Sequence, residues 1–173
     1  KFLKKHLLTR PKFKMGYYHR KVNSTYKKRY EAFDGFAVLN DQYKAMIAKA
    51  VGTTADDSKL FTLQNPIQPI AEDQSHTDRK KRVIFVGRLS YEDKRVDRLL
   101  KVWEILNEKV SDWELTIIGN GSEEKNLKNY AKRHKLTRVN FVDFTANPEL
   151  YYKESEILCL TSDFEGCPMV LLE

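Results

Sequence analysis

The stretch RVIFVGRL, residues 82–89, decides the fold of this chain. Its apolar residues 83–86 have the length of a buried strand, and the run ends at Gly87. The stretch is followed by apolar residues at helical spacing, namely Val96, Leu99, Leu100, Trp103, Leu106 and Val110. It therefore predicts a strand followed by an amphipathic helix, which is the building unit of a parallel sheet.

The same pattern recurs toward the C-terminus. Further strands are expected at 115–118, 139–142 and 157–160. Three further helices are expected. The first would bury a face formed by Leu127, Tyr130, Ala131 and His134, the second would begin at Asn147-Pro148, and the third would begin at Pro168. Strands rich in Val, Ile and Leu that alternate with helices are typical of a parallel sheet covered on both faces. We therefore predict an α/β fold with a Rossmann-like sheet over residues 82–173.

The N-terminal part of the chain predicts a smaller unit. Residues 36–39 and 60–63 have the pattern of strands, and a helix between them is expected to be capped by Asn40 or Asp41 and to stop at Gly52. Residues 1–33 are interpreted as two short helical pieces. Residues 67–81 contain Pro69 and a run of polar side chains, which indicates a hinge between a unit at 1–66 and a domain at 82–173.

Composition and charge exclude several classes of protein. The chain has 173 residues, of which 41% are apolar, and no apolar stretch approaches the roughly 20 residues that cross a membrane as a helix. Its two cysteines, Cys159 and Cys167, cannot build a disulfide framework or a four-ligand zinc site. The net charge of +7 is concentrated in residues 1–30, which hold eleven Lys and Arg and no acidic residue. This basic segment predicts a contact with an anionic surface.

Candidate binding residues follow the predicted strands, because ligands of open parallel sheets bind beyond the carboxyl ends of the strands. Gly87, Arg88 and Lys94 suit a phosphate or diphosphate, since a glycine lets the chain approach and the cations pair with the anion. Gly119 and Gly121 form only half of a dinucleotide-binding fingerprint, and a tight turn explains them equally well.

The last nine residues carry the sharpest signal. Glu165 and Glu173 are separated by seven residues, and Pro168 between them predicts the start of a helix. A helix N-terminus attracts anions, and carboxylates accept hydrogen bonds from sugar hydroxyls. Both carboxylates are therefore expected to flank one ligand. The alternative is that Glu165 caps the helix and Glu173 is exposed.

Together these motifs resemble a known family. The residues that carry the resemblance are Gly87-Arg88-Leu89, Lys94, Gly119-x-Gly121 and Thr161-Ser162-x-x-Glu165-Gly166-x-Pro168-Met169-Val170-x-x-Glu173. In this order and spacing they resemble the donor half of the family 4 (group 1) glycosyltransferases, which are retaining, metal-independent enzymes of the GT-B fold. The resemblance covers residues 82–173 and implies that 31–70 are the end of an acceptor domain.

The resemblance implies a role for each site residue. Arg88 and Lys94 would bind the donor diphosphate, Glu165 the transferred sugar, and Glu173 the nucleotide ribose. The substrate-binding set that it implies is Gly87, Gly119, Gly121, Asp143, Phe144, Gly166, Cys167, Pro168, Met169, Val170 and Glu173, with Asp143 and Phe144 near the base. The chain departs from the family at Asp143, where glycine is frequent, and at Cys167, where a bulkier apolar residue is usual.

The implied function is transfer of a sugar from a UDP- or GDP-sugar to a hydroxyl of a glycan or lipid-linked acceptor, with retention. The resemblance implies a role in cell-surface polysaccharide synthesis, in the cytoplasm and at the inner face of the membrane, without cofactor, metal or nucleic acid. Most of the acceptor domain is expected to lie outside this chain, so that the chain alone is inactive. The alternative is a non-catalytic module in which the basic, aromatic-rich segment binds nucleic acid, or the loops bind a nucleotide.

Overall fold

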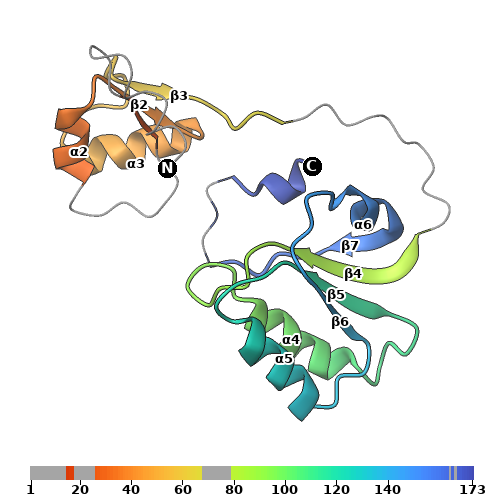
Figure 1. Cartoon of the computed structure of the whole chain (residues 1–173). Coiled ribbons are helices and arrows are strands. Elements are labelled where there is room, and N and C mark those ends of the chain that lie inside the picture. Colours follow the sequence, from red (N-terminus) through yellow and green to blue (C-terminus); the bar gives the residue numbers. More distant parts are fainter. Residues whose placement is uncertain (1–14, 18–25, 68–78, 164, 166) are drawn as a thin grey trace. The chain divides into compact units, whose positions relative to one another are not determined.

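The structure, a computed structural model, describes residues 15–17, 26–67, 79–163, 165 and 167–173. The chain divides into two compact units, Lys1–Pro66 and Ile67–Glu173. Each unit holds its own parallel sheet (Figure 1).

The first unit is built on a three-stranded parallel sheet in the order β1-β2-β3. Its elements are β1 (Met15–Tyr17), α2 (Tyr26–Ala32), β2 (Gly35–Val38), α3 (Asp41–Val51) and β3 (Leu60–Thr62). Its core consists of Tyr30, Phe36, Val38, Ile47, Ala48, Val51 and Leu60. The two strands and the helix expected between residues 36 and 63 are thus confirmed.

The ends of α3 form as the sequence predicts. The Asn40 side chain accepts a hydrogen bond from the backbone N–H of Tyr43 at 3.1 Å, which caps the start of the helix. At the other end Gly52 is left-handed, with φ of 82°, and its N–H donates to the carbonyl of Ala48. A glycine accepts this conformation without the steric cost that a Cβ would bring.

Among the described residues of 1–33, one expected helical piece is present as α2. The sequence analysis did not expect the strand β1 at residues 15–17, which pairs in parallel with β2 through Gly16 and Phe36. The buried neighbouring strand supplies the hydrogen bonds of β1, and this tertiary pairing is not visible in the local sequence. Residues 1–14 and 18–25 lie outside the described residues.

The second unit contains a four-stranded parallel sheet in the order β6-β5-β4-β7. Its elements are β4 (Lys80–Val86), α4 (Val96–Leu106), β5 (Glu114–Ile118), α5 (Glu124–Arg133), β6 (Val139–Val142), α6 (Glu149–Glu154), β7 (Ser155–Leu158) and the 3₁₀ turn η2 (Met169–Leu171). All neighbouring strands are parallel, so the predicted α/β fold with a Rossmann-like sheet is confirmed.

Strand β4 begins earlier than expected, at a residue assigned to the predicted hinge at 67–81. The strand begins with basic residues, whose side chains form ion pairs with acidic side chains of neighbouring elements. Lys80 Nζ lies 2.7 Å from a carboxylate oxygen of Glu154, and Arg82 Nε lies 2.5 Å from one of Glu114. Residues 68–78 of the hinge lie outside the described residues.

The core of the second unit lies on one face of the sheet. Alternate strand residues, among them Phe85, Leu115 and Ile117, pack against the helices, whose buried residues are Val96, Leu99, Leu100, Trp103, Leu127 and Ala131. Figure 1 shows α4 and α5 side by side on this face, and α6 beside β7 on the other. This is the arrangement that right-handed crossovers require, because the chain turns back after β6 to reach β7.

That return places β5 and β7 on opposite sides of β4. The loop after β4 therefore runs toward β5, whereas the loop after β7 belongs to the other half of the sheet. In open α/β sheets, such a reversal of strand order leaves a crevice at the carboxyl ends of the strands. The candidate site is expected at this reversal.

Candidate functional site

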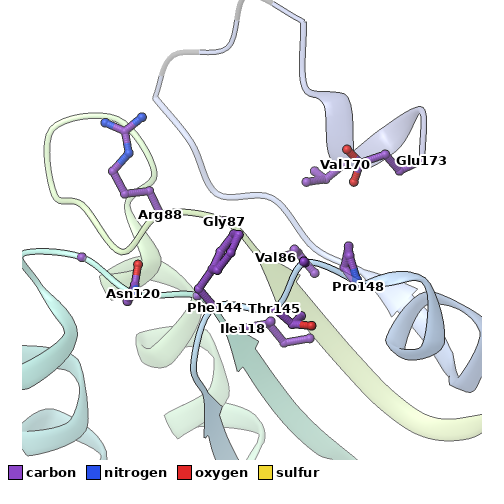
Figure 2. Close-up of a pocket in the computed structure, with 13 residues that line it drawn as sticks. Val86, Gly87, Arg88, Ile118, Asn120, Phe144, Thr145, Pro148, Val170 and Glu173 are labelled. Atoms are coloured by element: carbon purple, nitrogen blue, oxygen red, sulfur yellow. The ribbon is translucent and has the colours of Figure 1, made fainter. Parts of the chain in front are cut away.

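A cavity of about 630 Å³ lies beyond the carboxyl ends of β4, β5 and β6. The register brings Val86, Ile118 and Val142 side by side, so the loops that follow these residues surround the cavity together. Of the residues that the sequence predicts for the site, the cavity is lined by Gly87, Arg88, Gly119, Gly121, Phe144, Val170 and Glu173. Figure 2 shows Arg88 on one side of it and Val170 and Glu173 on the other.

The glycines allow two loops to touch along their backbones. A Cβ at Gly119 would overlap the carbonyl oxygen of Gly87, and a Cβ at Gly121 would overlap that of Leu89. The loops are also joined by hydrogen bonds, from Gly87 N to Ile118 O and from Leu89 N to Asn120 O, each 3.0 Å long. The Gly-x-Gly pattern is therefore explained by close packing of the β4 and β5 loops.

Arg88 offers a positive charge to the cavity. It is the second residue after the end of β4 and is exposed. It has no carboxylate within ion-pair distance in the described part of the chain. A guanidinium in this position can bind an anion bidentately.

Lys94 and Glu165 form an ion pair beside the cavity. The Lys94 Nζ lies 2.6 Å from Oε1 of Glu165, and the Ser162 hydroxyl donates to the same oxygen at 2.6 Å. The Cε of Lys94 lies 4.0 Å from the position that a Cβ of Gly87 would take, so the lysine passes close to the loop that lines the cavity. The structure thus brings together two predicted catalytic residues.

Glu173 faces the cavity and is held by a residue that the sequence analysis missed. The Tyr152 hydroxyl donates a hydrogen bond to Oε2 of Glu173 at 3.1 Å. Burial, followed by the charge of this carboxylate, raises the pKa of Tyr152. The tyrosine lies on α6, and no motif marks it, because its role depends on how α6 sits against residues 169–173.

Other predicted site residues do not line the cavity. These are Lys94, Glu165, Asp143, Cys167, Pro168 and Met169. In particular, Glu165 faces Lys94 while Glu173 faces the cavity, so the two carboxylates do not flank one cavity as expected. Gly166 lies outside the described residues.

The helix expected from Pro168 is a single 3₁₀ turn, Met169–Leu171. Pro168 is extended, with ψ of 100°, and the five residues after it close one backbone hydrogen bond of the α type, from Glu173 N to Met169 O. Among the residues that line the cavity, Arg88 carries the positive charge.

Two other properties bear on the class of site. Within the residues that the structure describes, no three His, Cys, Asp or Glu side chains gather closely enough to hold a metal ion. None of the helices among the same residues has the length and apolar character needed to span a bilayer.

A parallel sheet with a ligand-sized cavity beyond the carboxyl ends of its strands defines an α/β protein that binds its ligand there. Within that class, the chain belongs to the glycosyl transferases group 1 family, whose model matches residues 67–173. The family and the GT-B fold that the sequence predicts are thereby confirmed.

Two relatives illustrate this membership. The chain is 38% identical over 117 residues to an uncharacterized glycosyltransferase of Haemophilus influenzae, which covers 67% of this chain and 33% of that protein. It is 29% identical over 129 residues to the lipopolysaccharide 1,6-galactosyltransferase of Salmonella typhimurium, which covers 72% of this chain and 35% of that protein. The chain therefore spans about a third of the length of these relatives.

A solved structure shares the fold. It is the pneumococcal O-GlcNAc transferase GtfA in complex with UDP and GlcNAc, with a TM-score of 0.73 and 16% sequence identity over 91% of this chain and 34% of that chain. At this identity the likeness concerns the fold alone.

Proposed function

We propose that this chain is the donor-binding part of a glycosyltransferase that moves a sugar from a UDP- or GDP-sugar to a hydroxyl of a glycan or lipid-linked acceptor. The observation that carries the proposal is the cavity beyond β4, β5 and β6, with the exposed Arg88 on one side and Glu173 on the other. A cation and a carboxylate so placed suit the two polar parts of a nucleoside diphosphate, its phosphates and its ribose.

Each part of the donor has a partner in the proposal. Arg88 binds the diphosphate through charge-assisted hydrogen bonds, and the close approach of Gly87 leaves room for it. Phe144, whose side chain is 71% exposed at the cavity, stacks against the base. Glu173 accepts hydrogen bonds from the ribose hydroxyls, and Tyr152 fixes the direction of its carboxylate.

The chemistry depends on the leaving group. When the bond between the anomeric carbon and the diphosphate oxygen breaks, negative charge develops on the diphosphate. Arg88 and Lys94 stabilise this charge, and each charge-assisted hydrogen bond contributes about 1.5–3 kcal/mol. Lys94 exchanges Glu165 for a phosphate oxygen in this step, which frees the Glu165 carboxylate for a hydroxyl of the transferred sugar.

The remaining steps belong to the whole protein. The proposed transfer retains the anomeric configuration and uses no metal, and the acceptor binds mostly outside this chain, so that the chain alone transfers no sugar. The galactosyltransferase among the relatives, which acts on lipopolysaccharide, supports an acceptor in a cell-surface glycan. A peripheral contact of the basic residues 1–30 with anionic lipid at the cytoplasmic face suits such an acceptor.

Calorimetric titration of the protein with UDP, GDP and ADP tests the proposal. Saturable binding of UDP or GDP that weakens at least about tenfold in Arg88→Ala is expected, since such a loss corresponds to about 1.4 kcal/mol. Arg133→Ala, which removes an exposed arginine from α5, is the matched control. Absence of nucleotide binding together with steeply salt-dependent binding of RNA would support the alternative, nucleic-acid-binding function.

A further inference from the structure

The loop after β4 (residues 87–95) is joined to the loop after β7 (residues 159–165) across the reversal of strand order. The Thr161 hydroxyl lies 3.1 Å from the carbonyl oxygen of Lys94 and 3.0 Å from that of Arg95. The backbone N–H of Asp163 donates to the carbonyl of Asp93 at 2.9 Å. One side of the junction carries Lys94, and the other leads to Glu165.

Arg95 has an unusual backbone at this junction. It is left-handed, with φ of 48° and ψ of 44°, at the residue that precedes α4. A residue with a Cβ adopts this conformation only at a cost, so the surroundings must hold it there. No side chain caps the helix at this position.

The side chain of Arg95 supplies part of that hold. Its guanidinium donates to Asp97 at 3.0 Å and to Asp163 at 2.9 Å, and it lies 4.4 Å from the ring centroid of Tyr91. Asp163 also forms an ion pair with Arg98 of α4 at 2.5 Å. Asp163 therefore binds α4 and the residue before it to the β7 loop.

This arrangement fixes the direction of Lys94. The carbonyl of Lys94 and the strained residue that follows it are both tied to the β7 loop, so the peptide unit between them cannot rotate freely. If residue 95 relaxed to a right-handed or extended backbone, the orientation of that peptide unit would change and Lys94 would point elsewhere. In this orientation Lys94 pairs with Glu165, which follows β7.

We propose that Thr161 and Asp163 are positioning residues that hold Lys94 where it meets the donor diphosphate. They act through the backbone at Lys94 and Arg95 and do not themselves touch the donor. This inference rests on the proposed function, because it takes the diphosphate as the partner of Lys94.

A double-mutant cycle on the whole protein tests the inference. The variants are Thr161→Val, Lys94→Ala and the double substitution, and the measurement is the calorimetric Kd for UDP, or for GDP if the wild-type protein binds that nucleotide instead. Thr161→Val keeps the shape of the side chain and removes the hydroxyl, whereas Thr161→Ser keeps the hydroxyl. Thr137→Val, which removes an exposed hydroxyl at residue 137 before β6, is the matched control.

The expected result is a rise in Kd of about three- to tenfold in Thr161→Val, the effect of losing one hydrogen bond. Thr161→Ser should restore wild-type affinity, and Thr161→Val should have no further effect once Lys94 is alanine, because a residue that acts through Lys94 cannot act without it. Where kinetics are measured, kcat/KM for the donor should fall in Thr161→Val and return to the wild-type value in Thr161→Ser.

Three results would overturn the inference. The first is an unchanged Kd in Thr161→Val. The second is that Thr161→Val weakens nucleotide binding as much in the Lys94→Ala protein as in the wild type. The third is a Thr161→Ser variant that binds the nucleotide as weakly as Thr161→Val. If Thr161→Val does not fold, Asp163→Asn enters the same cycle with the same expectations. A wild-type protein that binds neither UDP nor GDP would refute the proposed function, and the inference with it; nucleotide binding with additive losses would refute the inference alone.

Discussion

The ammonium group of Lys94 and the carboxylate of Glu165 form a 2.6 Å ion pair between two loops that are 71 residues apart in the sequence. Only 21% of the lysine side chain and 23% of the glutamate side chain are exposed. Two charges of opposite sign are thus kept together beside the cavity, and in the proposed function an incoming diphosphate competes with a carboxylate for the lysine. The first prediction concerns this competition.

Glu165→Gln should separate binding from transfer. Removing the negative charge frees Lys94 for phosphate, so the protein should bind UDP or GDP at least as tightly as the wild type. Sugar transfer by the whole protein should fall at least about tenfold, because the contact between Glu165 and the transferred sugar is lost, at a cost of about 1.4 kcal/mol. Calorimetry and steady-state kinetics measure the two effects. Weaker nucleotide binding with unchanged turnover would contradict the assignment.

Arg88→Ala should reduce turnover of the whole protein at least about tenfold, since it removes a positive charge that stabilises the leaving diphosphate. Arg88→Lys should recover only part of the loss, because an ammonium cannot bind two oxygens with the fixed geometry of a guanidinium. The steady-state kcat/KM for the donor is the measurement. Arg133→Ala should behave as the wild type, and an Arg88→Ala enzyme with wild-type kinetics would place the diphosphate elsewhere.

Tyr152→Phe should weaken nucleotide binding without unfolding the protein. The hydroxyl that holds Glu173 contributes about 0.5–1.5 kcal/mol, so the Kd should rise roughly two- to tenfold. The neighbouring Tyr151→Phe is the control, because it removes a hydroxyl from the same helix without breaking the bond to Glu173. Equal affinities for the two variants would show that Tyr152 does not position Glu173.

Gly119→Ala should destabilise the second unit more than Gly87→Ala does. Both glycines have a positive φ, 134° and 157°, so both substitutions carry a backbone cost. Only the Cβ at Gly119 would overlap backbone, whereas at Gly87 it would meet the Phe85 ring at 3.4 Å. Overpacking of this kind should lower the unfolding free energy of Gly119→Ala by about 1–3 kcal/mol beyond the backbone cost that both variants share. Urea unfolding gives the two free energies, and equal values would contradict this account of the loop contact.

Asp163 should contribute to stability in a pH-dependent way. The hydrogen bonds from Arg98 and then Arg95 lower the pKa of this carboxylate in the folded protein. Because the pKa is lower in the folded protein, the ionised carboxylate stabilises the fold at any pH above its pKa in the unfolded chain, about 3.9. This contribution is lost as the pH falls through the pKa of the folded protein. The difference in unfolding free energy between wild type and Asp163→Asn should therefore shrink from pH 6 to below about pH 4. A difference that stays constant over this range would exclude the ion pairs as its source.

Features determined by local sequence could be predicted from it. Residues 83–86 and 139–142, which are rich in Val, Ile and Phe, form strands as expected. Asn40 and Gly52 cap α3 as expected, because the effect of a cap reaches only a few residues. The form of residues 169–171 could not be judged in this way, because a proline start signal such as Pro168 fits a 3₁₀ turn as well as the first turn of an α-helix.

The parts of the site that depend on long-range contacts could not be predicted. Nothing in the sequence around Arg95 signals a left-handed residue, since its conformation depends on Asp163 and Thr161, which are more than sixty residues away. The bond from Tyr152 to Glu173 joins two segments by the packing of α6 alone. The spacing of Glu165 and Glu173 drew attention to the segment that contributes Glu173 to the cavity. It did not show that Glu165 pairs with Lys94 while Glu173 pairs with Tyr152.

The contact of Gly119 and Gly121 with the β4 loop restricts any redesign of donor preference. Because both positions leave no room for a side chain, Gly119 and Gly121 cannot be used to introduce groups that distinguish one base from another. The β6 loop is free of this restriction, since Phe144 already projects a large side chain that is 71% exposed. A library intended to change the accepted nucleotide should therefore vary residues 143–146 and leave the glycines untouched.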